Sequence, residues 1–329
     1  MTITANPQEI LSLAQNFMEC RVLLTGAELD IFTHLAKPAS SKALAEKQGW
    51  HERPLTVVLD ALCAMGLLNK KDGQYRTEPD LLAFLSADSS QSVLPMVKHA
   101  ATIWTNWSNL TRIVTETGIA NRTPARFQGE DQKAFIQAMH VVGRPHAPAI
   151  VKAIQPGAAR RLLDIGGASG TYTIAFLNES PQMSATIFDL PDVIDMGRVK
   201  IAESGLKDRV EFVSGNFYTD PLPPGYDLAL LSAIIHQNSP DQNLALFKKI
   251  ATALIPQGRL VIRDHVMKKD KTAPKSGALF AINMLVGTPG GGTYTFDDIK
   301  TGLVQAGFEN IRIIQEKDHM MGLIEAFCP

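Results

Sequence analysis

The sequence has 329 residues, a net charge of −1 and 45% hydrophobic residues, a composition that is typical of a globular protein and excludes a disordered one. The chain lacks the basic excess of a nucleic-acid binder, and no apolar run is long enough to cross a membrane. There is no signal-peptide pattern, and three scattered cysteines (Cys20, Cys63 and Cys328) are too few for a disulfide framework or a zinc site. We therefore expect a cytoplasmic protein without a nucleic-acid, membrane or metal partner.

The first hundred residues are predicted to be mostly helical. Apolar residues recur at helical spacing, or capping residues bound a helix, in four segments: 8–24, 27–35, 41–49 and 53–66. Residues 67–77 then alternate around Asp72-Gly73, which is a strong hairpin signal. Three helices followed by a short hairpin are typical of a winged helix, so residues 1–100 are predicted to form a winged-helix domain.

A winged helix has two possible uses, DNA binding and dimerisation. The segment in the place of a recognition helix, residues 51–65, carries Glu52, Arg53 and Asp60, and this acidic excess opposes contact with phosphates. Residues 8–35 also hold more apolar faces than a small helical domain needs for its own core. We interpret the domain as a dimerisation module and expect a homodimer.

The middle of the chain connects a mostly helical N-terminal part to a C-terminal part in which strands alternate with helices. A polar stretch over 86–95 predicts a linker, and 96–155 is predicted to be helical with a loop at 118–130. We assign 101–155 to a helical connector that contributes to a substrate pocket. From residue 156 onward the chain is assigned to a third region.

In that third region strands alternate with helices. Continuous apolar runs, as expected of strands covered on both faces, alternate with amphipathic segments and predict a doubly wound parallel sheet. The tail differs, because a helix over 296–306 is followed by two strands joined by a turn. We expect an α/β, Rossmann-like domain whose sheet edge is closed by an antiparallel hairpin.

A glycine-rich turn follows the first of these strands. The segment LLDIGGASG places Asp164 at the strand end and Gly166, Gly167 and Gly170 in the turn before a helix. Glycines there permit tight turning and a close approach of the backbone to a ligand. The turn alone is also compatible with simple βα packing.

An acidic residue at the next strand end favours a nucleoside ligand. Asp189 follows Asp164 by 25 residues and is placed to accept hydrogen bonds from ribose hydroxyls, although it is also compatible with a helix cap. Asp164 can hold a cationic amine but would repel a pyrophosphate. The pair therefore favours S-adenosylmethionine over a dinucleotide.

The ordered motifs of the chain resemble a known family. GAELDIFTHLA, ALAEKQG and LTVVLDALCAMGLL in the N-terminal part, and LLDIGGASG, FDLPDVI, VSGNFYTDPLP, LLSAIIHQNSPDQ, IPQGRLVIRD, NMLVGTPGGGTYT and LVQAGF in the C-terminal part, are similar to class I O-methyltransferases of the caffeic acid and acetylserotonin type. The resemblance covers nearly the whole chain. It implies a dimeric, S-adenosylmethionine-dependent enzyme with a small-molecule acceptor.

The resemblance also implies roles for single residues. It places the glycine turn, Asp164, Asp189 and Leu190 at the cofactor, with Asn216 and Phe217 beside the adenine and Ser232 where plant members have a lysine. It implies that His236 is the catalytic base and that Asp264 orients it. Two departures stand out: the family's His-Asp-Trp is His236-Gln237-Asn238 here, and Thr293 replaces an acid that many plant members place near the base.

The residues themselves support a base at His236. It follows the apolar run YDLALLSAII, at the carboxyl end of a strand where open α/β sheets bind ligands. An imidazole is largely neutral at pH 7 and can take a proton from a phenol, and Asp264 would fix its tautomer. A helix cap or a surface histidine is the alternative.

Weaker signals concern the acceptor and metals. The resemblance makes Met139, His140, Asn283 and Met284 candidates for the acceptor pocket. Core packing is an equal alternative for Met139 and His140, and it is the commoner role of a methionine such as Met284. His140 and His146 are six residues apart, which is the wrong spacing for a helical metal pair, and no carboxylate cluster favours magnesium. The sequence thus predicts O-methylation of a small aromatic hydroxyl, with C-methylation or a cofactor-assisted rearrangement as the alternative.

Overall fold

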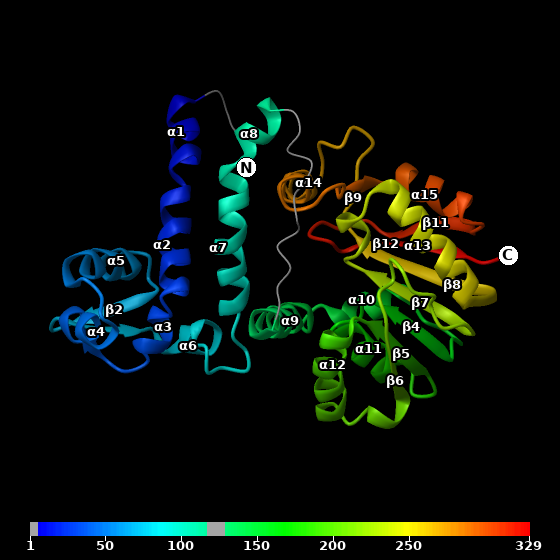
Figure 1. Cartoon of the computed structure of the whole chain (residues 1–329), viewed down its shortest axis with the longest axis horizontal. Coiled ribbons are helices and arrows are strands. Elements are labelled where there is room, and N and C mark those ends of the chain that lie inside the picture. The colour runs from blue at the N-terminus through cyan, green and yellow to red at the C-terminus, as the bar shows by residue number, and fades with distance from the viewer. Residues whose placement is uncertain (1–5, 117–128) are drawn as a thin grey trace. The chain divides into compact units, whose positions relative to one another are not determined.

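The structure is a computed structural model that describes residues 6–116 and 129–329 (Figure 1). The chain divides into two compact units, Met1–Thr105 and Asn106–Pro329. Most of the loop expected at 118–130 lies outside the described residues. Residues 101–105 of the expected connector belong to the first unit, and the helices after residue 108 belong to the second. No helix among the described residues is long and apolar enough to cross a membrane.

The first unit consists of helices and a small antiparallel sheet. Its helices are α1 (Pro7–Gln15), α2 (Phe17–Glu28), α3 (Ile31–His34), α4 (Ser41–Gln48), α5 (Glu52–Ala64), α6 (Pro79–Leu85) and α7 (Leu94–Ser108), the last of which runs into the second unit. Its strands are β1 (Ala39–Ser40), β2 (Leu68–Lys71) and β3 (Gln74–Thr77), in the order β1-β3-β2.

Local signals account for most of these boundaries. Ser40 accepts a hydrogen bond from the amide of Ala43 at the start of α4, and Gly49 ends the helix in the left-handed conformation. The predicted hairpin is confirmed, because β2 and β3 pair around a turn in which Asp72 and Gly73 both have positive φ. The helical segment expected over 8–24 is broken at Asn16 into α1 and α2.

The second unit is a mixed seven-stranded sheet with helices on both faces (Figure 1). Its helices are α8 (Leu110–Thr115), α9 (Gly129–Gly143), α10 (Ala147–Ile154), α11 (Thr171–Glu179), α12 (Pro191–Glu203), α13 (Pro240–Ala253), α14 (Lys275–Gly287) and α15 (Phe296–Gln305), with short 3₁₀ turns at Lys207–Arg209 and Ile235–Gln237. Its strands are β4 (Arg161–Ile165), β5 (Ser184–Asp189), β6 (Val210–Ser214), β7 (Tyr226–Ser232), β8 (Leu254–Asp264), β9 (Val266–Met267), β10 (Tyr294–Thr295), β11 (Glu309–Gln315) and β12 (Gly322–Phe327).

The topology matches the sequence expectation. The sheet order is β11-β12-β8-β7-β4-β5-β6, in which β8, β7, β4, β5 and β6 are parallel. β12 is antiparallel to β8, and β11 is antiparallel to β12, so the predicted hairpin closes the sheet edge. The order reverses between β4 and β7, which is the switch point where ligands of such sheets bind.

Side-chain alternation along the strands builds one core on each face of the sheet. On one face α10, α11 and α12 pack on Leu162, Ile187, Leu230 and Val261. On the other face α13 and α15 pack on the residues of opposite parity, such as Leu231. Side chains two residues apart in a strand point to the same face of the sheet. The face of each polar residue at a strand end therefore follows from the core to which its neighbour two residues earlier belongs.

Candidate active site

The glycine turn between β4 and α11 is packed too tightly for side chains. A Cβ on Gly166 would lie 2.7 Å from Cδ1 of Ile234, and Gly166 has a φ of +70°. A Cβ on Gly167 would lie 2.8 Å from the carboxyl carbon of Asp164. The turn therefore needs glycine for its own geometry, and it leaves backbone rather than side chains at the switch point.

Asp164 lies beneath this turn and is fully buried. Its carboxylate accepts a hydrogen bond of 2.6 Å from the hydroxyl of Thr173 on α11. Burial raises the pKa of Asp164 to about 6, and the nearby charge of Asp189 acts in the same direction. The negative charge of this buried carboxyl is costly, so the site is suited to binding a cation, which would offset that cost.

Asp189 ends β5 and ties the glycine turn to that strand. One carboxylate oxygen accepts a hydrogen bond from the amide of Ala168 at 2.8 Å, and the other accepts one from the amide of Leu190 at 2.7 Å. Burial raises the pKa of Asp189, although these two amides oppose the shift. Each oxygen retains a lone pair, so the carboxylate can still accept a hydrogen bond from a ligand hydroxyl.

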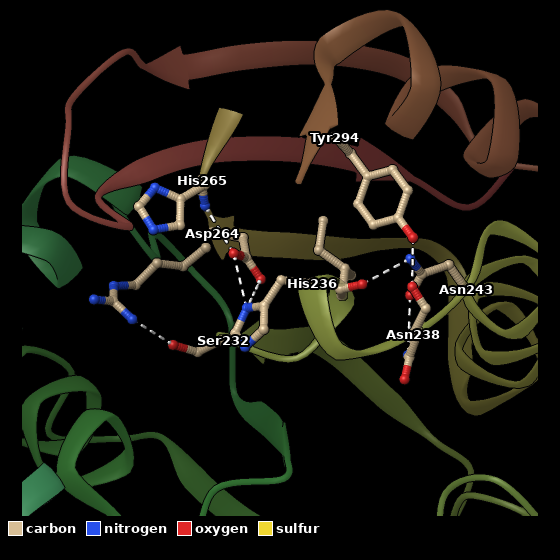
Figure 2. Close-up of polar contacts among 9 residues, drawn as sticks. Ser232, His236, Asn238, Asn243, Asp264, His265 and Tyr294 are labelled. Carbon is tan, nitrogen blue, oxygen red and sulfur yellow. Dashed lines mark hydrogen bonds and ion pairs between the residues drawn. The ribbon is translucent and has the colours of Figure 1, made fainter. Parts of the chain in front are cut away.

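His236 and Asp264 form the closest candidate acid–base pair (Figure 2). Nδ1 of His236 lies 3.0 and 2.9 Å from the two oxygens of Asp264, which ends β8 and is only 1% exposed. A carboxylate can only accept, so Nδ1 carries the proton and Nε2 is left as an acceptor. The amide of His265 donates the other hydrogen bond to Asp264, at 2.8 Å.

His236 lies four residues beyond the end of β7, in a 3₁₀ turn rather than on the strand. A buried polar network beside His236 holds this turn in place (Figure 2). Asn238 is fully buried, accepts a hydrogen bond from Tyr218, donates one to Asn243 and accepts one at its carbonyl from Tyr294. Asn243 in turn donates to the carbonyl of Ile235 at 2.9 Å.

The Pro-Gly-Gly-Gly segment completes the support of this turn. The amide of Gly292 donates to the carbonyl of His236 at 2.8 Å. A Cβ on Gly291 would lie 2.5 Å from the same carbonyl oxygen, so this segment requires glycine. Thr293, which occupies the place of a family acid, is buried.

Two of the acceptor candidates lie on the helix that contacts His236. Phe280 of α14 meets the imidazole ring edge-on, with ring centroids 4.9 Å apart. Asn283 and Met284 follow at positions i+3 and i+4 and so share this side of α14. The indole of Trp107 donates a hydrogen bond of 3.1 Å to Asn283, and Met284 is buried.

The other two candidates lie on α9, and His140 contacts the glycine turn. Its Nδ1 is 2.8 Å from the hydroxyl of Thr171 and 3.5 Å from that of Ser169. Burial lowers the pKa of His140, which favours the neutral ring. Met139 is 39% exposed. The structure thus brings His140 to the cofactor turn, and Asn283 and Met284 to the side of His236.

The remaining residues predicted to bind the cofactor also follow the carboxyl ends of the parallel strands. Phe217 lies close to the glycine turn, since a Cβ on Gly166 would be 3.9 Å from its ring. The side chain of Asn216 accepts a hydrogen bond from the amide of Tyr218 and caps a turn. Leu190 is 43% exposed, and Ser232 accepts a hydrogen bond from Arg263. No group of three or more potential metal ligands occurs among the described residues.

The comparisons with known proteins decide the family. The model of the O-methyltransferase domain matches residues 118–309, which is more than half of the chain, and the model of the O-methyltransferase dimerisation domain matches residues 11–80. The chain belongs to the O-methyltransferase family. The predicted family, the fold class and the enzyme class, an S-adenosylmethionine-dependent methyltransferase, are thereby confirmed.

Two curated relatives and one solved structure match this chain over nearly their whole length. The chain is 30% identical to the tetracenomycin polyketide synthesis 8-O-methyl transferase TcmO of Streptomyces glaucescens, with 94% of each protein covered. It is 28% identical to the 3-hydroxy-5-methyl-1-naphthoate 3-O-methyltransferase of Streptomyces sahachiroi, with 94% of the chain and 91% of the relative covered. The structure of PigF with SAH superimposes with a TM-score of 0.83 at 26% identity, covering 98% of this chain and 99% of PigF.

Sequence reasoning missed several residues of this site. Asn238 was seen only as a departure from a motif, whereas it is the centre of the network under His236. Phe280 gave no signal beyond helical apolarity. Arg263 could have been noticed, because it is a charged residue inside the apolar strand run RLVIRD.

Proposed function

We propose that this methyltransferase transfers a methyl group from S-adenosylmethionine to a hydroxyl of a small aromatic molecule, with His236 as general base. The observation that carries the proposal is the contact of 2.9 Å between Nδ1 of His236 and the buried carboxylate of Asp264. This pair lies at the sheet edge that also holds the glycine turn. The names of the two Streptomyces relatives, both O-methyltransferases, support an oxygen acceptor.

The residues at the glycine turn fit S-adenosylmethionine. Gly166 and Gly167 leave no side chain over the turn, Asp189 retains acceptor capacity for the ribose hydroxyls, and buried Asp164 suits the ammonium group. Phe217 offers an apolar surface beside the turn for the adenine. When bound, this cofactor supplies an activated methyl group on a sulfonium.

The chain itself contributes a proton transfer and positioning. Nε2 of His236 takes the proton of the acceptor hydroxyl, and the resulting oxyanion is a far better nucleophile than the phenol. Asp264 holds the ring in the tautomer that leaves Nε2 free and stabilises the imidazolium that forms. Phe280, Asn283 and Met284 on α14 hold the acceptor ring near the imidazole, so that most of the catalysis is orientation.

We assign the N-terminal unit to a winged-helix dimerisation module and the enzyme to a cytoplasmic homodimer. The match to a dimerisation domain over residues 11–80 supports the dimer. The three cysteines are free, which suits a reducing compartment. The acceptor pocket, with Met139 and His140 on α9, belongs to the second unit.

The decisive experiment follows a labelled methyl group. The purified enzyme is incubated with S-adenosylmethionine carrying a CD3 group and a panel of phenols and hydroxynaphthalenes, each paired with its O-methyl ether. We expect a CD3 ether from at least one phenol and none from its paired ether. Transfer to carbon, or consumption of cofactor without transfer, would contradict O-methylation and favour the family's other chemistries.

A further inference from the structure

One face of the sheet carries a row of polar residues at its carboxyl edge. Asp189 shares parity with Ile187, Ser232 with Leu230 and Arg263 with Val261, and these apolar residues all belong to the core under α10 and α11. Asp264, the partner of His236, has the opposite parity. The row therefore lies on the cofactor side of the sheet and is separate from the acid–base pair.

The strand register places this row at one level. Ser232 pairs directly with Arg263, and Ile165 pairs with Phe188 on one side and Leu231 on the other. Extending the register by one residue puts Gly166 between Asp189 and Ser232. Across β5, β4, β7 and β8 the row therefore consists of an acid, a glycine without a side chain, a hydroxyl and a cation: Asp189, Gly166, Ser232 and Arg263. Asp164 precedes Gly166 by two residues on the same face of β4.

Arg263 is the member of this row that lacks an ionic partner. Its Nη1 donates to the hydroxyl of Ser232 at 3.1 Å, its guanidinium stacks on Tyr172 with 4.9 Å to the ring centroid, and its buried Nε has no hydrogen-bond partner. None of the carboxylate side chains that the structure describes lies within ion-pair distance of it. Arg259, on the same strand and face, is instead paired with the buried carboxylate of Glu325.

A half-buried, unpaired guanidinium is costly unless an anion joins it, and a planar fork is the preferred partner of a carboxylate. The order of charges along the row is complementary to the order of polar groups along one kind of ligand. An amino-acid nucleoside has a ribose diol, then an ammonium, then a carboxylate, and the row offers Asp189, then Asp164, then Arg263. Because Arg263 reaches back over β7 to Ser232, its guanidinium lies about two strand spacings, roughly 10 Å, from β5.

We infer that Arg263, held by Ser232 and Tyr172, binds the carboxylate of the cofactor's amino-acid arm. This inference rests on the proposed function, because it takes S-adenosylmethionine as the ligand of the glycine turn. It makes Arg263 the residue that distinguishes the intact cofactor from nucleosides that lack the carboxylate.

The test compares two ligands by calorimetry. S-adenosylhomocysteine and its decarboxylated analogue, in which the arm ends as an aminopropyl group, are titrated into the wild type and into Arg263→Gln. We expect the variant to bind S-adenosylhomocysteine roughly 10- to 100-fold more weakly, the effect of a lost charge-assisted pair, and to bind the analogue as the wild type does. Arg263→Lys should restore part of the affinity.

A matched control comes from the amino-terminal end of β4, at the other end of the parallel strands. Arg161 stacks on Tyr226 with 5.0 Å to the ring centroid, so Arg161→Gln removes a similar cation–ring contact far from the row, and its affinities should equal those of the wild type. Equal losses for both ligands in Arg263→Gln would mean a general disturbance and overturn the inference. So would unchanged affinity for S-adenosylhomocysteine with a raised KM for an acidic acceptor. If the wild type binds neither ligand, the proposed function itself fails.

Discussion

At the scale of single residues, two buried carboxylates, Asp164 and Asp264, differ in their hydrogen-bond partners and therefore in the role that we assign to each. Asp264 is buried but accepts hydrogen bonds from His236 and from the amide of His265. Asp164 is buried with one hydroxyl partner, Thr173, and burial raises its pKa to about 6. The first arrangement holds Asp264 in place to orient the base. The charge of Asp164, in contrast, is costly in its buried site, and a bound cation would offset that cost.

The base is tested by removing the imidazole. In His236→Ala we expect turnover on a neutral phenol to fall by roughly 10²- to 10⁴-fold, with unchanged affinity for S-adenosylhomocysteine, because only the proton transfer is lost. The loss should shrink for a more acidic phenol, which reaches the site already ionised. Initial rates and calorimetry check both points.

The control for this variant is His51→Ala, which removes an exposed histidine whose side chain makes no cap hydrogen bond. It should turn over like the wild type. Asp264→Asn should reduce turnover less than His236→Ala, because it disturbs the tautomer and keeps the imidazole. Normal turnover of His236→Ala at pH 7 would show that the histidine is structural.

The raised pKa of Asp164 predicts a pH-dependent stability. The folded protein holds this proton up to about pH 6, whereas the unfolded chain releases it near its ordinary value, so the contribution of Asp164 to stability falls as pH rises between about 4 and 6. Asp164→Asn keeps an acceptor for Thr173 and removes the charge. Its free energy of unfolding, relative to the wild type, should therefore be higher at pH 8 than at pH 4.5, by of order 1–3 kcal/mol.

Urea unfolding at the two pH values measures this difference. The same variant should bind S-adenosylmethionine more weakly, because the ammonium loses its counter-charge. A relative stability that does not change with pH would show that the pKa of Asp164 is not raised in the folded protein.

At the scale of elements, the sequence predicts what local patterns determine. The strands, the glycine turn before α11 and the hairpin of β2 and β3 follow from apolar runs and turn residues, and all three are found as expected. The break at Asn16 and the 3₁₀ turn that carries His236 were not expected. The 3₁₀ turn depends on contacts with distant segments, such as the bond from Gly292 to the carbonyl of His236, which have no local signature.

The turn that carries His236 is tested through Asn238. Asn238→Ala leaves the buried side-chain carbonyl of Asn243 without its donor, which should cost about 1–3 kcal/mol of stability. Because Asn243 also holds the carbonyl of Ile235, the turn should shift and kcat should fall, while affinity for S-adenosylhomocysteine stays the same.

Tyr294→Phe provides the graded comparison. It removes only the hydroxyl that donates to the carbonyl of Asn238 and keeps the ring, so its effect on kcat should be smaller. If Asn238→Ala loses stability but keeps the kcat of the wild type, the network supports the fold and does not position the base.

At the scale of the whole molecule, the first unit carries an apolar surface that its own core does not use. α1 has no buried residue, and five large apolar side chains of α1 and α2 are between 50 and 55% exposed: Ile10, Leu11, Leu13, Phe17 and Met18. Several exposed large apolar side chains on two consecutive helices are unusual on a monomer and point to an interface. Because this region overlaps the match to the dimerisation domain, a second copy of the chain is the expected partner.

The interface is tested with two charges rather than a deletion, so that the domain core is kept. In Leu13→Glu/Phe17→Glu, burying two carboxylates against apolar side chains should raise the dimer dissociation constant roughly 100-fold or more, and sedimentation velocity at micromolar concentration should show monomer. Val304→Glu changes an equally exposed apolar residue on α15, outside the match to the dimerisation domain, and should remain a dimer. A double variant that sediments as the wild-type dimer would place the interface elsewhere, and a wild type that sediments as a monomer would leave the apolar face of α1 and α2 without its expected partner.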